Sequence, residues 1–129
     1  MKLNQATVGV TDYAVAVDFY TRLGLKQIVD AAPRYARFET PGGETFSIHV
    51  TEQVSPTATT YFEVEDVDAF IAGLDLPLLH PPLDQDWLWR EARLADPSGN
   101  IICIYHAGEN RRFPPWRLRE TVAPGGGSR

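Results

Sequence analysis

The side chains best suited to chemistry are His49, Cys103 and a pair of arginines, Arg37 and Arg93. A histidine can act as a general base when a proton lies within hydrogen-bond reach, and a cysteine can act as a nucleophile beside a base. Paired guanidinium groups can hold a carboxylate or another planar anion. The alternatives are a ligand-contacting histidine, a small buried cysteine and arginines that pair across strands. The glutamates available for such pairing are Glu39, Glu63 and Glu91.

A duplicated unit supplies the elements that position these side chains. Val10-Thr-Asp and Val64-Glu-Asp lie 54 residues apart, and each ends a strand-like run and begins a helical pattern. The turns that contain Gly43 and Gly99 lie 56 residues apart, and each precedes an alternating strand. A period of about 50 residues is within the range of repeated architectures. Two copies of one unit therefore organise the chain.

Hydrophobic periodicity predicts the order strand, helix, strand, strand, strand in each copy. Asp12 and Asp66 are suitable N-caps for the helices, which we expect to end at Gly24 and Leu74. Residues 80–89 contain too much proline and aspartate for a strand interior and are predicted to form an ordered loop. The predicted strands are residues 3–10, 25–30, 35–39, 45–50, 59–64, 76–79, 91–95 and 101–105.

Strand alternation divides the side chains between an apolar face and an open face. Phe46 and Ile48 belong to the core face, as do Ile102 and Ile104 at the equivalent positions. The open face combines tyrosines, both signs of charge and a histidine, which favours a ligand-lined cleft over a plain solvated face. We expect ligand contacts from Gln5, Tyr35, Arg37, Ser47, His49, Thr59, Tyr61, Glu63, Trp87, Arg93, Cys103 and Tyr105. Trp87 and Trp89 form a wall of this cleft or pack structurally.

Charge is distributed unevenly along the 129 residues. Net charge is −5, with −8 on residues 1–106 and +3 on residues 107–129. An acidic body disfavours nucleic acid, which requires a positive surface. No apolar run reaches the roughly 18 residues of a membrane span. With one cysteine no internal disulfide can form, and we expect a cytoplasmic protein.

The composition changes after His106. We expect one domain over residues 1–106, with modules at 1–52 and 57–106, followed by a C-terminal extension over 107–129. Phe113, Trp116 and Leu118 are costly to leave in water. The extension is therefore expected to dock on the body or on a second subunit, and residues 123–129 are expected to be disordered.

The paired motifs resemble those of the vicinal oxygen chelate superfamily, which includes glyoxalases, bleomycin-resistance proteins and extradiol dioxygenases. The resemblance rests on the Val10-x-Asp-x5-Asp-Phe-Tyr-x2-Leu-Gly-Leu stretch and on Asp96-Pro-Ser-Gly-Asn-Ile-Ile. It implies an α+β fold in which two tandem βαβββ modules form a curved, cup-like mixed sheet with helices on its outer face. It also implies a homodimer. Fold alone does not determine the chemistry.

The same resemblance places four metal-ligand positions on Gln5, Ser47, Thr59 and Cys103. Only Gln5 keeps a usual ligand type, and hydroxyl groups are poor substitutes for carboxylate or imidazole donors. An irregular site remains conceivable if the register slips, since Cys103 suits zinc. Its members would be Gln5, His49, Glu63 and Cys103.

These observations support three hypotheses. The first is a metal-free protein without a cofactor that binds a polar or planar small molecule in the cup. The second is a metal-dependent lyase, isomerase or dioxygenase of the same superfamily. The third is a non-enzymatic interaction protein that uses the extension around Phe113 and Trp116.

Overall fold

The duplication seen in the sequence is a structural duplication. A computed structural model describes residues 1–53 and 58–119. The predicted start of the second module at residue 57 and the expected disorder of residues 123–129 lie outside the described residues. The first module contains β1 (Gln5–Val10), α1 (Tyr13–Leu23), β2 (Lys26–Ala31), β3 (Tyr35–Glu39) and β4 (Thr45–Val50). The second contains β5 (Thr59–Glu63), α2 (Val67–Ala72), β6 (His80–Asp84), β7 (Arg90–Ala95) and β8 (Ile101–His106), and η1 (Gly108–Arg111) follows it.

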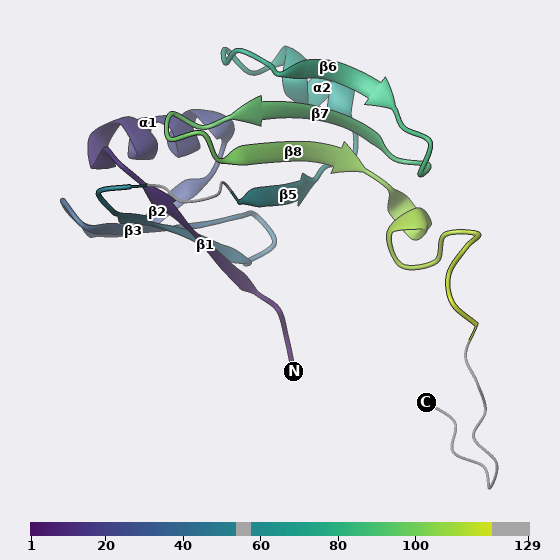
Figure 1. Cartoon of the computed structure of the whole chain (residues 1–129), viewed down its shortest axis with the longest axis horizontal. Helices are drawn as coiled ribbons and strands as arrows, with labels where there is room; N and C mark the ends of the chain where they lie inside the picture. The colour runs from purple at the N-terminus through teal and green to yellow at the C-terminus, as the bar shows by residue number, and fades with distance from the viewer. Residues whose placement is uncertain (54–57, 120–129) are drawn as a thin grey trace, which may run out of the picture.

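Each module forms one four-stranded sheet (Figure 1). The strand orders are β1-β4-β3-β2 and β5-β8-β7-β6, so β1 and β5 are edge strands. β1 is parallel to β4 and β5 is parallel to β8, while the remaining neighbours are antiparallel. Thr7 lies opposite Ser47, and Tyr61 takes the equivalent place opposite Cys103. The predicted fold of two tandem βαβββ modules is confirmed.

Both helices begin at the predicted aspartates. The Asp12 side chain accepts a hydrogen bond from the Val15 amide at 3.1 Å, and Asp66 accepts one from the Ala69 amide at 3.0 Å. α1 ends at Gly24, whose φ of 115° is readily adopted only by glycine. α2 ends at Ala72, two residues before the predicted end, because Gly73 is a poor helix residue. In the described part of the chain, no helix has the length and apolar character needed to cross a membrane.

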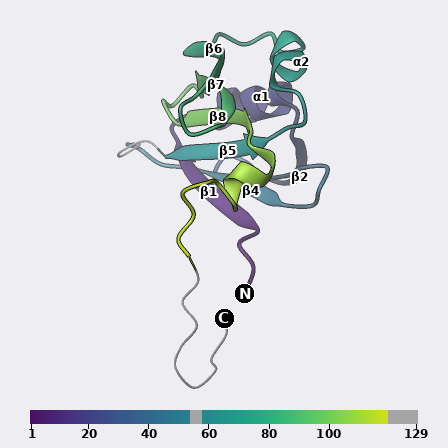
Figure 2. The ribbon, with the colours of Figure 1, turned by 90° about the vertical axis from the view of Figure 1, so that its right-hand side faces the viewer.

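The apolar faces of the two sheets share one core. The buried cluster contains Phe46 and Ile48 of the first sheet together with Ile102 and Ile104 of the second, and the helices pack against both. Figure 2 shows α1 and α2 in the angle between the sheets. Because side chains alternate along a strand, the two open faces point to the outside of this angle. The strands thus form two sheets around the helices, and the two open faces of one chain do not enclose a cup.

A buried polar cluster ties the modules together. Asp96, in the turn between β7 and β8, accepts hydrogen bonds from the Tyr20 hydroxyl at 2.5 Å, the Asn100 side-chain amide at 3.0 Å, and the Ser98 and Asn100 backbone amides at 2.8 and 2.9 Å. Asn100 also donates to the Gly9 carbonyl at 2.8 Å. α1 and the end of β1 are therefore held against the second module by charge-assisted hydrogen bonds.

The strand prediction for residues 76–79 is wrong, and residues 80–89 are not entirely loop. The sixth strand is β6 (His80–Asp84), despite its two prolines. It is the outer strand of the second sheet, and its register against β7 shifts between His80 and Leu83. Proline has no amide hydrogen to donate to a neighbouring strand. It is therefore tolerated on an edge strand and where the register shifts.

Beyond η1, residues 112–119 of the extension do not pack on their own body, although its first residues do. Residues 112–119 run away from the sheets beyond η1 (Figure 1). Phe113, Trp116 and Leu118 keep 53%, 57% and 89% of their surface exposed. The predicted docking of the extension on a second subunit stays a prediction.

We expect high pH to destabilise the wild-type protein more than a Tyr20→Phe variant. Burial and, after it, the hydrogen bond to Asp96 raise the pKa of Tyr20 above its ordinary value of 10.0. The unfolded chain ionises first, so this stabilisation is complete below pH 10 and is lost as the pH rises towards the folded-state pKa. Urea unfolding from about pH 8 to about pH 11 measures the effect. If the free energy of unfolding falls equally with pH in the wild-type protein and in Tyr20→Phe, the prediction is contradicted.

Candidate functional site on the open face of the second sheet

Three aromatic rings form a cluster on the open face of the second sheet. The Trp89 and Tyr105 rings are stacked, with centroids 4.3 Å apart and an interplanar angle of 16°. Tyr61 meets both rings edge-on, at 6.0 Å from Trp89 and 5.9 Å from Tyr105. Tyr105 is buried, whereas Tyr61 keeps 48% of its surface exposed. The cluster therefore offers a rigid aromatic surface to which a planar ligand can pack.

A charged group lies beside the aromatic cluster. The Arg93 Nε donates to the Glu91 Oε2 at 2.7 Å, and the His80 Nε2 lies 3.4 Å from the same oxygen. Glu91 is 2% exposed, and its Oε1 has no hydrogen-bond partner among the described residues. The Arg93 guanidinium also lies 5.8 Å from the Tyr61 ring centre, as in a cation–π contact. Arg93 thus pairs with Glu91, one of the glutamates considered for it, but the pair lies along β7 and not across strands.

Cys103 is a buried thiol beneath this group. Burial and, to a smaller extent, the nearby Glu91 carboxylate raise the pKa of the Cys103 thiol to about 11, although Arg93 acts in the opposite direction. A thiol with this pKa remains protonated at neutral pH, and the thiolate is the reactive form. Between the two roles considered for Cys103, the structure favours the small buried residue over the nucleophile.

We therefore expect Cys103 in the native protein to react with a disulfide reagent at about neutral pH roughly a hundredfold or more slowly than in urea-unfolded chain. Two causes act together: a raised pKa and complete burial of the side chain. The absorbance of the thiolate that the reagent releases measures the rate at which Cys103 reacts. A native rate within a few fold of the unfolded one would contradict this assignment.

The open face of the first sheet has its own hydrogen bonds. The Arg37 Nε donates to the Tyr35 hydroxyl at 2.8 Å, and Thr7 and Ser47 share a hydrogen bond of 2.6 Å. Burial opposes ionisation of Tyr35, but the hydrogen bonds with Ser47 and Arg37 outweigh it and lower its pKa. His49 is exposed at the end of β4. This face is polar and partly preorganised, with one aromatic residue.

The predicted ligand-contacting residues therefore fall into two groups. Gln5, Tyr35, Arg37, Ser47 and His49 lie on the first sheet, and Thr59, Tyr61, Glu63, Arg93, Cys103 and Tyr105 lie on the second. Within residues 1–53 and 58–119, no hydrogen bond, ion pair or aromatic contact joins the two groups. Trp87 lies at the tip of the β6–β7 hairpin with 43% of its surface exposed.

The four positions that correspond to metal ligands do not fit a metal site in one chain. The Gln5 side-chain oxygen accepts a hydrogen bond from Thr45, and Ser47 is bonded to Thr7. Cys103 and Thr59 are on the other sheet, and the Thr59 hydroxyl is a poor metal ligand. No group of three His, Cys, Asp or Glu side chains in the described ranges could hold a metal ion. We therefore assign no chemical step to a metal.

Glu63, a member of the irregular metal site considered above, has other partners. The Glu63 Oε2 accepts hydrogen bonds from the Ala107 and Gly108 amides at 2.8 and 3.0 Å, while its Oε1 lies 3.7 Å from the Arg111 Nε. Glu63 therefore anchors the beginning of the extension to β5. Gln5 and His49 lie on the first sheet, and no hydrogen bond or ion pair joins the Glu63 carboxylate to them among the described residues.

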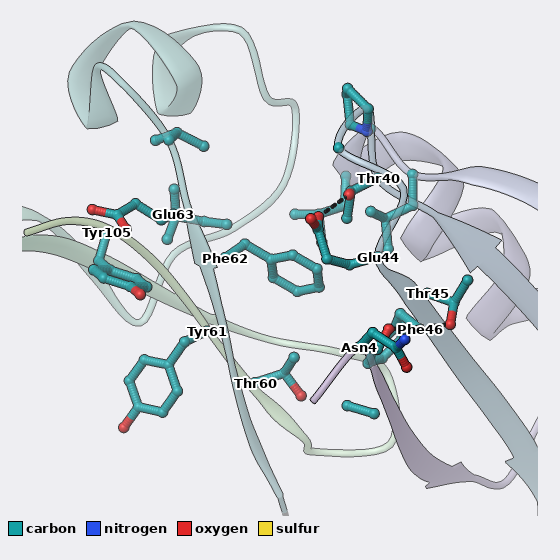
Figure 3. A pocket seen from close by; sticks show the side chains of 18 of the residues that line it. Asn4, Thr40, Glu44, Thr45, Phe46, Thr60, Tyr61, Phe62, Glu63 and Tyr105 are labelled. Carbon is teal, nitrogen blue, oxygen red and sulfur yellow. Dashed lines mark hydrogen bonds between the residues drawn. The ribbon is translucent and has the colours of Figure 1, made fainter. Parts of the chain in front are cut away.

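A cavity lies between the modules. It encloses about 990 Å³ between the N-terminal part of β1, the β3–β4 turn, β5 and α2 (Figure 3). We call it the inter-module groove. Its apolar residues include Leu25, Phe46, Phe62, Val64 and Phe70, and its acidic residues are Glu44, Glu63 and Glu65. Tyr61 and Tyr105 adjoin it, so the groove and the aromatic cluster meet at β5.

Two contributors to the site were absent from the expected ligand contacts, although Trp89 was considered as a wall of the cleft. Trp89, rather than Trp87, belongs to the aromatic cluster, and Glu91 is its buried carboxylate. Glu91 was considered as an ion-pair partner, and its position two residues before Arg93 on β7 is the signal that places it on the same face. The choice between the two tryptophans depends on the β6–β7 hairpin, in which the Gln85 amide donates to the Trp89 carbonyl at 2.8 Å.

A family model described as "Glyoxalase/Bleomycin resistance protein/Dioxygenase superfamily" matches residues 2–104. The chain belongs to this superfamily, as its paired modules indicate. No curated protein matches the sequence significantly.

Solved structures show the same fold at low sequence identity. A glyoxalase/bleomycin resistance protein/dioxygenase from Nocardioides has a TM-score of 0.72 and 18% identity, with 92% of this chain and 90% of that chain covered. A lactoylglutathione lyase from Agrobacterium tumefaciens has a TM-score of 0.71 and 15% identity, covering 81% and 92%. A bleomycin-binding protein complexed with bleomycin has a TM-score of 0.68 and 16% identity, covering 82% and 98%.

Proposed function

We propose that this protein binds a planar, polar small molecule on the open face of the second sheet, without a metal ion. The aromatic cluster of Tyr61, Trp89 and Tyr105 is the observation that carries the proposal. Its stacked rings supply apolar area, and Arg93 supplies hydrogen-bond donors at its edge. Binding sites commonly combine aromatic walls with a few placed polar groups.

The comparisons support the binding of a small molecule. A protein of similar fold is described as a bleomycin-binding protein in complex with bleomycin. At 16% identity the two proteins share a fold, so the ligand has to be argued from this chain's own residues. Those residues favour a compound with a flat aromatic portion and an acceptor for Arg93.

We further propose that a second copy completes the binding site. The open faces point outwards in one chain, so a ligand on the aromatic cluster has protein on one side only (Figure 2). Drug-sized ligands are usually buried over most of their surface. A homodimer that brings another open face against the cluster provides the missing wall. For such a dimer the cytoplasm is the proposed compartment, since the single cysteine does not depend on oxidation.

A thermal-shift screen tests the proposal. Protein treated with a chelator is heated with a panel of heteroaromatic acids, flavonoids and bleomycin. We expect at least one compound to raise the melting temperature by several degrees at about a hundred times its dissociation constant, because a ligand that binds only the folded state stabilises it. Elemental analysis of untreated protein accompanies the screen. A panel without a stabilising compound, or stoichiometric Zn, Ni, Mn or Fe, would count against it.

The dimer is tested separately by dilution. If two chains form one site, the affinity for the panel compound decreases once the protein is diluted below its dimer dissociation constant. Sedimentation measures the dimer, and titration at several protein concentrations measures binding. Binding of undiminished affinity by the monomer would show that one chain is sufficient.

A further inference from the structure

The C-terminal segment, residues 112–119, is a basic apolar peptide with a preformed shape. It carries three arginines and no acidic residue. The Arg112 and Arg117 guanidinium groups lie 5.1 and 4.4 Å from the Phe113 ring centre. Arg117 also donates from its side chain to the Arg112 carbonyl and from its backbone to the Pro114 carbonyl. A segment ordered in advance loses less conformational entropy when it binds.

The apolar side chains of this segment are not covered by their own chain. Phe113, Trp116 and Leu118 are exposed within eight residues, and Figures 1 and 2 show the segment leaving the body. Adjacent exposed apolar groups with a polar rim are typical of a surface that contacts another protein. The family model ends at residue 104, so this segment lies outside the matched residues.

The inter-module groove has the complementary chemistry. Phe46, Phe62 and Phe70 supply apolar surface, and in Figure 3 the Phe62 ring lies in the opening between Glu44 and Tyr61. Glu44 and Glu65 add negative charge to its rim. The groove runs along the edge strand β5, and the structure leaves it open.

We propose that residues 112–119 of one copy dock in the inter-module groove of a second copy. The aromatic side chains would cover the groove's apolar surface, and the arginines would face its glutamates. Residues 1–106 carry a net charge of −8, which repels nucleic acid or an anionic membrane and attracts this segment. The segment begins beside its own groove, at Arg111, but then runs away from it (Figure 2). The proposal does not depend on the ligand of the open face.

Disulfide trapping between full-length chains tests the proposal. One chain carries Arg119→Cys, which leaves Phe113 and Trp116 intact, and the other carries Glu65→Cys in the groove. We expect a mixture of the two to form a covalent heterodimer under mild oxidation. The native Cys103 is buried, so wild-type chain provides the background. A chain with Asp18→Cys, an exposed position on α1, replaces the groove variant as the matched control.

Charge dependence completes the test. Arg117→Glu in the tail-labelled chain should reduce heterodimer yield about tenfold, whereas Lys26→Glu, an equal charge change on β2, should leave it within about twofold, because only nearby charges are coupled. Equal yields for the groove and α1 cysteines would overturn the proposal. So would a double variant, Arg119→Cys with Glu65→Cys, that forms its disulfide within one chain, since that result places the segment in its own groove.

Discussion

Replacing Asp96 with alanine is expected to lower the free energy of unfolding by about 3 kcal/mol or more, with a melting temperature lower by roughly 10 °C. Asp96 is 4% exposed and accepts four hydrogen bonds, from Tyr20, Ser98 and Asn100. Alanine leaves all four donors without their acceptor, and buried donors without a partner are costly. The loss also removes the polar link between α1 and the second module, so the effect should exceed that of a local turn.

Asp66→Ala is the matched control for this prediction. Asp66 is also an aspartate at the start of a structural element, but it is exposed and caps α2 through one hydrogen bond to the Ala69 amide. We expect it to cost about 1 kcal/mol. Urea unfolding of both variants and of Tyr20→Phe gives the comparison. If Asp96→Ala costs no more than Asp66→Ala, the buried cluster does not join the modules.

Replacing Trp89 with alanine is expected to weaken binding of the strongest panel compound by about tenfold to a hundredfold, as for other central aromatic residues in binding sites. Trp89 stacks on Tyr105 and meets the edge of Tyr61. Its removal takes away one face of the aromatic surface and frees Tyr61 to move. Both changes reduce the contact area and the preorganisation of the site.

Trp87→Ala is the control, because it removes the same side chain two residues away. Trp87 is exposed at the hairpin tip, so we expect its loss to change the affinity by no more than about threefold. Calorimetry is the suitable measurement, since both variants alter the tryptophan fluorescence. Urea unfolding confirms that each variant is folded. If Trp87→Ala and Trp89→Ala lose the same affinity, the ligand does not bind on the aromatic cluster.

Much of the local structure follows from short patterns of residues. Asp12, Asp66 and Gly24 mark helix boundaries because capping depends on neighbouring backbone groups. β6 was missed because its two prolines resemble a loop, and their tolerance depends on an edge position that the sequence does not reveal. Local rules thus predict an element well unless its position in the sheet determines which residues it tolerates.

The candidate site was predicted less completely. Strand alternation placed Tyr61, Arg93 and Tyr105 on one face, and all three lie together there. The same rule grouped Tyr35 and Arg37 with them, although those residues lie on the other sheet. Alternation gives the direction of a side chain relative to its own strand, and it contains no information about how two sheets are oriented.

The sequence by itself therefore determined the duplicated modules, their strand faces and the superfamily, because these depend on repeats and on contacts between near neighbours. Only the tertiary structure decided which faces meet. The modules are joined by contacts that are remote in sequence, such as Phe46 with Phe62 and Tyr20 with Asp96. These contacts place the helices between the sheets and turn both open faces outwards. Alternation with a period of two residues is the same whether the open faces of the two sheets point towards each other or outwards. The packing of the shared core therefore determines which of these orientations the chain adopts.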